Sequence, residues 1–199
     1  MIDSPKRIGI ISDLHCNAAA VERALALMGP IDTLVCAGDA IDQSRFSNEV
    51  VDLLRRHEAL TVQGNHEAHF FAPHGWRAQA GQRVSREHSA WLAHQPRRMT
   101  FDHFDTRVLI AHANSWDEGF DYVFPHSPDF HRFGEAEADI VIYGHTHLPV
   151  VQQVGSTLVI NPGSTGQGRP TESGFRFGCA VLQLPTREVQ LIEFDPIFN

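Results

Sequence analysis

The order of apolar segments constrains the fold of this 199-residue chain more than any other feature of its sequence. Residues 7–12, 32–37 and 60–63 are short, contain Val, Ile or Leu, and are typical of buried strands. Residues 17–28 and 47–57 lie between them and place apolar side chains three or four positions apart, as one face of a helix requires. This β-α-β-α-β order predicts a parallel sheet, because parallel neighbours need a crossover connection.

The rest of the chain is less regular. Residues 70–97 have few strand signals, and within them residues 83–94 are typical of a helix. An aromatic loop region follows at residues 116–133. Further strands are expected at residues 98–104, 106–112, 139–143, 150–154, 157–160, 177–184 and 189–194. Strands as close together as the last four usually pair antiparallel.

These segments predict an α/β (α+β) fold with two packed mixed β-sheets flanked by helices. A single doubly wound sheet is the alternative. The length suits one domain. We therefore expect a single domain over residues 1–199, with an inserted helical and loop region near residues 70–97.

Composition and charge narrow the function. The chain has 24 acidic and 16 basic residues, a net charge of −8 with His neutral, which argues against nucleic-acid binding. No apolar run reaches the roughly 20 residues of a membrane-spanning helix, so no membrane association is expected. Met1–Lys6 contains no secretory apolar region, so we expect a cytoplasmic protein. Cys16, Cys36 and Cys179 are too far apart to suggest a disulfide framework or a thiolate zinc site.

Side chains that can bind metal ions follow five of the predicted strands. The motifs are Asp13-Leu14-His15, Gly38-Asp39, Gly64-Asn65-His66-Glu67, His112 and Gly144-His145-Thr146-His147. Ligands of open α/β sheets bind at the carboxyl ends of the strands. Glycines beside the motifs allow the backbone to turn tightly and to approach a site closely.

The spacing within two of the motifs suggests how they bind. Asp13 and His15, like His145 and His147, are two positions apart, which in an extended segment places both side chains on the same side. Each pair can then bind a metal from one direction. The ligand atoms are oxygen and nitrogen, without thiolate. Such a set suits Mn, Fe, Co, Ni or Zn better than Ca or Mg, which prefer oxygen ligands alone.

Each motif alone has a simpler interpretation. Asp13 is a suitable helix cap, and Gly38-Asp39 or Asn65 suits a turn. A single histidine such as His112 is more often a hydrogen-bonded core residue. The occurrence of all the motifs together, in this order and at strand ends, favours a metal site.

The motifs together resemble those of the calcineurin-like metallophosphoesterase superfamily. They span residues 13–147, and Asn161-Pro162-Gly163-Ser164 resembles the small bacterial and archaeal phosphodiesterase-like branch, so the resemblance covers nearly the whole chain. It implies a metallophosphoesterase-type β-sandwich flanked by helices, in agreement with the expected architecture.

The resemblance also implies a centre with two divalent transition-metal ions. Manganese is the expected metal, with iron, zinc, nickel and cobalt as alternatives. The implied ligands divide into Asp13, His15 and His147 for one ion and Asn65, His112 and His145 for the other, with Asp39 bridging both. His66 matches a family histidine that lies near the leaving group and is not a ligand.

The sequence departs from the family pattern at two places. Relatives that act on phosphoproteins or dinucleoside polyphosphates usually carry Asp-Arg-Gly after Gly-Asp, and Arg before Gly-Asn-His. This chain has Asp42-Gln43-Ser44 and Gln63 there, so the phosphate-binding arginine of that branch is missing, although Arg45 is near. Ala113 stands where the family often has Gly, which removes no ligand.

The implied function is dinuclear metal-dependent hydrolysis of a small phosphate ester. The two ions would clamp the phosphate and activate a bridging hydroxide that attacks phosphorus, and His66 would act as general acid. The small domain and the missing arginine favour a phosphodiesterase. A phosphomonoesterase or a protein or nucleotide phosphatase is the alternative. A protein-binding scaffold is less favoured, because every ligand position is intact. The sequence specifies neither the natural substrate nor the oligomeric state.

Residues 70–97 and 116–133 lie between the motifs. We expect both segments to overhang the metals and to shape the substrate pocket, with Trp116 and Phe120 as candidate contacts. The alternative is that they are packing flaps without a role in specificity.

Overall fold

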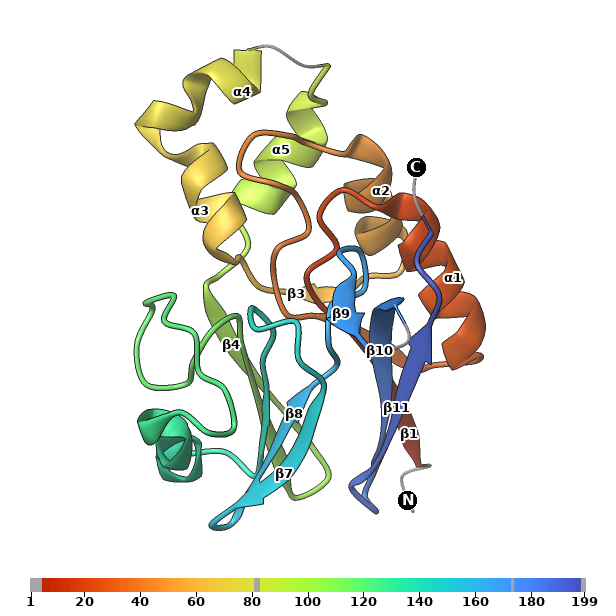
Figure 1. Ribbon diagram of the computed structural model, residues 1–199, viewed down its shortest axis with the longest axis vertical. Helices are drawn as coiled ribbons and strands as arrows, with labels where there is room; N and C mark the ends of the chain where they lie inside the picture. Colours follow the sequence, from red (N-terminus) through yellow and green to blue (C-terminus); the bar gives the residue numbers. More distant parts are fainter. Residues whose placement is uncertain (1–4, 81–82, 173, 198–199) are drawn as a thin grey trace.

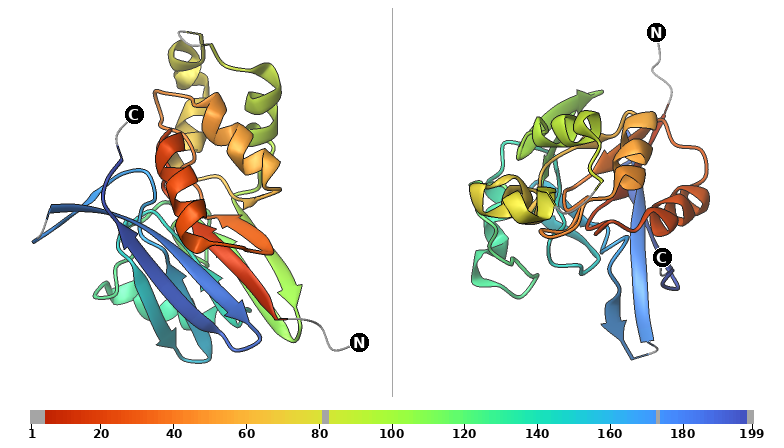
Figure 2. Two further views of the ribbon diagram at one scale, coloured as in Figure 1. Left: turned by 90° about the vertical axis from the view of Figure 1, so that its right-hand side faces the viewer. Right: turned by 90° about the horizontal axis from the view of Figure 1, so that it is seen from above.

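Two mixed β-sheets pack against each other, with helices over the outer face of one of them (Figures 1 and 2). The structure is a computed structural model that describes residues 5–80, 83–172 and 174–197. The predicted fold class is confirmed, and the alternative of a single doubly wound sheet is wrong. Residues 1–4, from which the absence of a secretory segment was argued in part, and residues 81–82 of the predicted insertion lie outside the described residues.

The first sheet contains the predicted parallel strands. In spatial order its strands are β11 (Glu188–Phe194), β10 (Gly174–Leu184), β1 (Lys6–Ile11), β2 (Thr33–Cys36) and β3 (Leu60–Thr61), with β9 (Arg169–Thr171) paired to the start of β10. β1 pairs parallel with β2, and β2 with β3, as the β-α-β-α-β order predicts. β10 joins them by antiparallel pairing with β1 and β11. β9 was not predicted, because three residues that include Pro170 carry no alternating pattern.

The second sheet has parallel strands at its centre and antiparallel strands at its edges. Its order is β4 (Arg98–His103), β5 (Thr106–Ala111), β6 (Ile140–Ile142), β8 (Thr157–Asn161) and β7 (Val150–Val154). β5, β6 and β8 are parallel, whereas β4 and β7 pair antiparallel with their neighbours. The expected antiparallel pairing of the late strands therefore holds for β7 with β8 and for β10 with β11.

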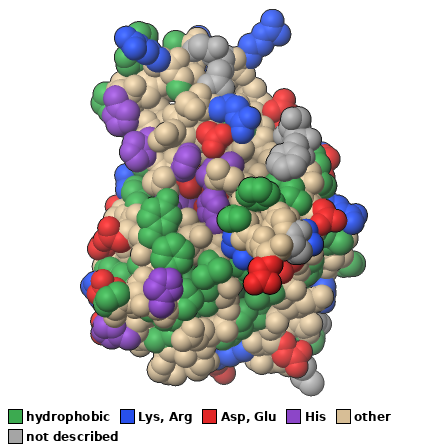
Figure 3. Space-filling view, viewed as in Figure 1, with side chains coloured by type: hydrophobic (Ala, Val, Ile, Leu, Met, Phe, Trp, Pro, Cys, Tyr) green, Lys and Arg blue, Asp and Glu red, His purple; other side chains and the backbone are tan. Residues whose placement is uncertain are grey.

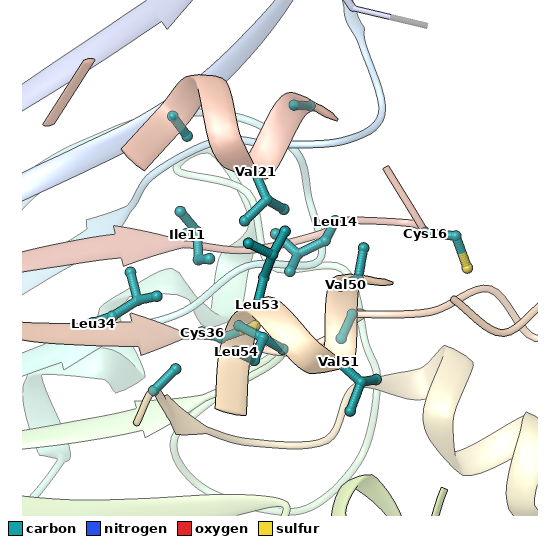
Figure 4. Packing of buried hydrophobic residues seen from close by; sticks show 14 of the residues in the cluster. Ile11, Leu14, Cys16, Val21, Leu34, Cys36, Val50, Val51, Leu53 and Leu54 are labelled. Carbon is teal, nitrogen blue, oxygen red and sulfur yellow. The ribbon is translucent and has the colours of Figure 1, made fainter. Parts of the chain in front are cut away.

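Helices α1 (Ala18–Met28) and α2 (Asn48–Arg56) pack on the outer face of the first sheet (Figure 1). Asn17 caps α1, since its side-chain oxygen accepts a hydrogen bond from the Ala20 N–H at 3.1 Å. Figure 4 shows Val21 of α1 and Leu53 of α2 beside Leu14, in a buried apolar cluster that continues to β1 and β2. This packing fixes the turns that leave the carboxyl ends of both strands.

Two further apolar layers complete the core. Ile10, Ile110 and Ile142 lie in a buried cluster between the two sheets. Phe133 and Tyr143 lie in another, where the aromatic loop region covers the outer face of the second sheet. This loop contains the 3₁₀-helical segment η2 (Pro128–Glu135).

The segment between β3 and β4 is more helical than predicted. The predicted helix is α5 (Arg86–Ala93), which Ser85 caps. The chain before it forms α3 (Asn65–Phe71), a 3₁₀ turn (Pro73–Gly75) and α4 (Trp76–Ala80), which were not predicted. α3 begins inside a motif that was interpreted as a loop, and its Phe70 is buried against Phe46 with ring centroids 5.6 Å apart. Whether this segment is an insertion, and residues 1–199 a single domain, stays a prediction. Among the described residues, no helix is both long and apolar enough to cross a membrane.

Candidate metal centre

The predicted ligands lie at one end of the two sheets, where the carboxyl ends of their parallel strands meet (Figure 1). The segments that carry them are Asp13 and His15 after β1, Asp39 after β2, Asn65 and His66 at the start of α3, His112 after β5, and His145 and His147 after β6. Strands that are far apart in the sequence thus deliver all eight side chains to one place. Figure 3 shows histidine and acidic side chains gathered near the centre of this face.

One group of ligand atoms comes from Asp13, His15 and His147, which lie within 4.8 Å of one another. The Nε2 atom of His147 is 3.3 Å from Asp13 Oδ1 and 3.3 Å from His15 Nε2. Asp13 is fully buried and His15 nearly so. Two imidazole nitrogens and a carboxylate oxygen at these distances suit a transition-metal ion.

A second group comes from Asp39, His112 and His145. His112 Nε2 is 3.2 Å from Asp39 Oδ2 and 3.1 Å from Asn65 Oδ1, so the Asn65 amide oxygen adjoins this group. His112 Nε2 is also 4.0 Å from Asp13 Oδ1. The two groups are therefore neighbours, and Asp39 lies in the second of them.

His66 completes a third group with His15 and Asp39. Its Nε2 atom is 3.8 Å from Asp39 Oδ2, and its Nδ1 atom accepts a hydrogen bond from the Gln43 N–H at 2.9 Å. Because Nδ1 is an acceptor there, the proton of a neutral His66 ring belongs on Nε2. The geometry keeps both a ligand role and a proton-donor role open for His66.

The expected extended conformation of the two His-containing motifs is wrong. Asp13, His15, His145 and His147 all have positive φ, between 44° and 64°. The chain turns sharply at each strand end, so alternation along an extended strand does not apply. As a result His145 and His147 lie in different ligand groups, whereas Asp13 and His15 share one.

Hydrogen bonds hold these unusual turns in place. The Asp13 N–H donates to Gly38 O at 3.0 Å, and the His145 N–H donates to the Asp13 carboxylate at 3.0 Å. From the Asn-Pro-Gly-Ser motif, the Ser164 hydroxyl donates to Asp13 O at 2.9 Å and the Asn161 amide to Gly144 O at 2.7 Å. The motif after β8 therefore acts as a brace between the turns after β1 and β6.

Two glycines are required because neighbouring side chains approach the backbone closely at these positions. A Cβ on Gly64 would lie 2.2 Å from Asp39 Oδ1, and one on Gly144 would lie 1.9 Å from Ser12 Oγ. Both distances are far below van der Waals contact. The sequence expectation that glycines beside the motifs allow close packing has a steric basis at these two positions.

Partners of the imidazole rings select which nitrogen faces the centre. His15 Nδ1 donates to Asp42 Oδ1 at 3.0 Å, and His112 Nδ1 donates to Ala37 O at 2.7 Å, which leaves Nε2 of each available to bind a metal ion. His145 instead donates from Nε2 to Phe120 O at 2.9 Å, which leaves Nδ1. Asp42 and the Phe120 carbonyl were not predicted as parts of the site. The only sequence signal for Asp42 was its position in the family motif, directly before the missing arginine.

Glu67 is a buried acid to which the sequence interpretation assigned no role. One of its carboxylate oxygens accepts hydrogen bonds from the N–H groups of Gly64 at 2.7 Å and Asp39 at 3.0 Å, and the other accepts from Ile41 N–H at 3.0 Å. The side chain is fully buried. Glu67 therefore ties the turn after β2 to the start of α3 and fixes the backbone of Asp39.

The histidines differ in charge because their surroundings differ. Burial opposes the protonation of His112, but the carboxylates of Asp39 and Asp13 and the Ala37 carbonyl together outweigh burial and raise the pKa of His112 to about 10. Burial lowers the pKa of His145 to about 4. Burial also lowers the pKa of His66. Burial of Asp13 favours its neutral form, but contact with His147 and other histidines holds its pKa well below the usual range.

Arg45 and Gln63, which lie where the sequence departs from the family pattern, form hydrogen bonds within the protein. Arg45 donates to Asp42 Oδ2 at 2.8 Å and to His15 O at 2.9 Å, so its charge is paired beside the centre. Gln63 donates to the carbonyls of Leu92 and Ala93 at the end of α5. Gln63 thus ties α5 to β3 and is not a substitute for the missing arginine.

The aromatic loop lies partly against the centre. The Tyr122 ring stacks on His145 with centroids 4.0 Å apart and is 61% exposed, and the Phe120 ring is 6.2 Å from that of His112. Trp116 instead packs on Phe133 within the core of the second sheet. The structure therefore places Phe120 near the ligands, and it favours the packing alternative for Trp116.

Two depressions flank a tight turn beside the centre. The turn is residues 42–45, closed by hydrogen bonds between the backbones of Asp42 and Arg45 at 3.0 and 3.2 Å. His15, Asp42 and Arg45 help to line a depression of about 290 Å³ on one side. Gln43 and residues of α3 and α4 line one of about 500 Å³ on the other. A group bound at the metal centre thus has room on both sides of the turn.

Comparison with known proteins identifies the family and agrees with the fold. The chain is 27% identical to an uncharacterised protein of Methanocaldococcus jannaschii, with 81% of this chain and 77% of the relative covered. It is 25% identical to a probable metallophosphoesterase of Methanothermobacter thermautotrophicus, with 83% and 80% covered. The structure of a metallophosphoesterase from Sphaerobacter thermophilus superposes with a TM-score of 0.77 at 24% identity, over 97% of this chain and 89% of that one. The calcineurin-like phosphoesterase superfamily domain matches residues 7–186, and the chain therefore belongs to this superfamily of phosphoester hydrolases.

Proposed function

We propose that the protein is a phosphodiesterase that acts on small phosphate esters with two divalent transition-metal ions, manganese being the expected metal. One observation carries the proposal: two neighbouring groups of buried ligand atoms meet at one end of the sheets. The proposed ligands are Asp13, His15 and His147 for one ion and Asn65, His112 and His145 for the other, with Asp39 shared. Oxygen and imidazole nitrogen without thiolate suit such ions.

Bound ions would neutralise phosphate charge and make a water molecule acidic enough to act as nucleophile. The protein holds the side chains that would bind these ions in fixed positions. Asp39 is 1% exposed, and its backbone is held by Glu67. Asp39 Oδ1 also accepts a hydrogen bond from the backbone N–H of His66 at 2.9 Å, which fixes the orientation of the carboxylate. Asp39→Asn should therefore lose more activity than any other single ligand change, because it weakens both ion sites.

His66 is the proposed general acid. Its Nε2 atom lies on the side of Asp39, and the Gln43 N–H on Nδ1 directs the exchangeable proton to Nε2. Burial lowers the pKa of His66, and its charged form also requires that Nδ1 gives up the hydrogen bond from the Gln43 N–H. An anionic phosphate bound beside the ring would favour this charged form. The proton would then pass to the departing alkoxide.

A diester is favoured over a monoester by the space around the centre. A phosphodiester carries two organic groups, and depressions of about 290 and 500 Å³ lie on the two sides of the 42–45 turn. Arg45, the nearest arginine to the missing family position, has its charge paired with Asp42. It is therefore poorly placed to select the extra charge of a monoester dianion.

The proposal is tested by assaying metal-loaded protein with bis(p-nitrophenyl) phosphate and with p-nitrophenyl phosphate. The diester should have the higher kcat/KM. A preference for the monoester would replace the diesterase assignment by a phosphatase. Hydrolysis of neither by metal-loaded protein would favour a protein-binding scaffold.

The role of His66 is tested by the choice of leaving group. A nitrophenolate needs little protonation, whereas an alkoxide needs much, so His66→Ala should slow alkyl or nucleotide diesters far more than nitrophenyl ones. Metal content should stay unchanged. Equal slowing of both substrate types would reduce His66 to an orienting residue, and loss of a metal ion would make it a ligand.

A further inference from the structure

The depression on the α3 and α4 side of the 42–45 turn has an unusual lining. Its side chains include His69 of α3, His74 of the 3₁₀ turn and Arg77 of α4, facing Gln43 and Ser44 of the 42–45 turn. Its volume of about 500 Å³ is in the range of small-molecule sites. In Figure 3, histidine side chains continue from the centre of this face toward the helices α3 and α4.

The charge of this lining is positive. None of the described residues that line the depression is an aspartate or glutamate. Arg77 forms no ion pair with any described residue, and its guanidinium lies 5.3 Å from the centre of the neighbouring Trp76 ring. An arginine without an ion pair among the described residues, beside two imidazoles and in a chain of net charge −8, makes this surface locally positive.

The depression adjoins the metal centre through His66. Gln43, which lines it, donates its N–H to His66 Nδ1 at 2.9 Å. His66 and His69 are three positions apart on α3 and so occupy the same face of the helix. His69 Nδ1 donates to Asn65 O at 2.7 Å, which leaves its Nε2 for another partner. A group that departs beside His66 would enter this depression.

We propose that the depression binds a negatively charged group on the leaving alcohol of the substrate. The preferred substrates are then phosphodiesters whose leaving alcohol itself carries a phosphate or a carboxylate, with Arg77 as the specificity-determining residue. The inference rests on the proposed diesterase function. In the reaction, a water oxygen bonds to phosphorus and the ester P–O bond to the leaving alcohol breaks. The departing oxygen takes the proton of His66, and the charged alcohol is released from the depression.

The test uses two esters that differ by one charge. Methyl 4-nitrophenyl phosphate and methyl 3-carboxy-4-nitrophenyl phosphate have similar phenolate leaving groups, but only the second carries a carboxylate. Metal-loaded wild-type protein should show a kcat/KM about fivefold higher for the carboxylated ester, the size expected of a partly exposed charge pair. The preference should fall with ionic strength. Arg77→Gln should abolish the preference and leave the rate on the ester without the carboxylate unchanged.

Arg23→Gln is the matched control, because it removes one positive charge from an exposed position on α1, outside the depression. It should keep the preference. The proposal is overturned if the wild type shows no preference, if Arg77→Gln retains it, or if Arg77→Gln slows both esters equally.

A binding measurement separates failure of this inference from failure of the diesterase function. Metal-free protein is titrated with 5-hydroxy-2-nitrobenzoate and with 4-nitrophenol while amide NMR signals are recorded. The carboxylated compound alone should shift the signals of Gln43, Ser44 and Arg77, and the shifts should be absent in Arg77→Gln. If neither ester is hydrolysed, the diesterase function fails, and this titration alone supports or overturns the anion site.

Discussion

Asp42→Asn should weaken the binding of one of the two proposed metal ions and leave the binding of the other unchanged. Asp42 accepts a hydrogen bond from His15 Nδ1 at 3.0 Å and pairs with Arg45, but it touches none of the residues of the second ligand group. The carboxylate fixes the orientation of His15 and makes its Nε2 atom a stronger ligand. Asparagine can still accept the hydrogen bond through its amide oxygen, so the ring orientation survives while the charge is lost.

The magnitude follows from these contacts. Loss of such an outer carboxylate typically lowers metal affinity about 10- to 100-fold. The Asp42 side chain is 24% exposed, which weakens its field. Burial opposes protonation of His15, but the Asp42 hydrogen bond together with the charges of Asp13 and Asp39 outweighs burial and raises the pKa of His15. Loss of the Asp42 charge therefore also reduces competition by protons. Both factors favour the lower limit, about tenfold or roughly 1.4 kcal/mol at one ion.

The assay is metal occupancy at each position, from anomalous X-ray scattering of crystals equilibrated with limiting Mn²⁺ buffered by a chelator. Occupancy at Asp13, His15 and His147 should fall in Asp42→Asn, with the neighbouring position unchanged. Arg45→Gln is the control, since it leaves the Asp42–His15 bond in place, and its effect should stay below about threefold. Equal loss at both positions, or no loss at either, would refute the assignment of Asp42 to one ion.

Three further outcomes are expected. Gly64→Ala should displace the Asp39 carboxylate, because the new Cβ would lie 2.2 Å from its Oδ1, and bound metal measured by elemental analysis should drop while the protein still folds. Metal binding at pH 7–8 should release a proton from His112, whose pKa in the metal-free protein is about 10, so metal affinity should rise with pH up to that value. Calorimetry in buffers of different ionisation heat counts the released protons, and a count of zero would contradict this prediction. Tyr122→Ala should expose the His145 ring and raise its pKa from about 4 toward the usual value in NMR titrations of metal-free protein, whereas an unchanged pKa would mean that other groups bury it.

The strands and the gathering of the candidate ligands at one place could be predicted, because both leave local signals. Buried strands are short apolar runs, and the candidate ligands follow them within a few residues, as Asp39 follows β2 and His112 follows β5. The conformation of the ligand turns could not be predicted, because long-range contacts impose it. His145 adopts a φ of 64° while its N–H is held by the carboxylate of Asp13, 132 positions earlier in the chain.

The supporting residues were harder to recognise for the same reason. Glutamate is common on the exposed surface of helices, yet Glu67 is buried and accepts hydrogen bonds from three backbone N–H groups. Phe120 contributes a carbonyl, which no side-chain pattern records. Arg77 belongs to a five-residue helix that has no buried residue and therefore no apolar periodicity. Such contributions become visible only when the loops are placed in space.

The central claim is that two metal ions at this centre are required for phosphodiester hydrolysis. It is tested most directly by adding Mn²⁺ stepwise to metal-free protein, while bound metal and hydrolysis of bis(p-nitrophenyl) phosphate are measured on the same samples. Activity should appear mainly with the second equivalent of bound metal, and Asp39→Asn should remain inactive throughout the titration. Full activity in the metal-free protein, or activity that does not change as metal binds, would contradict the account.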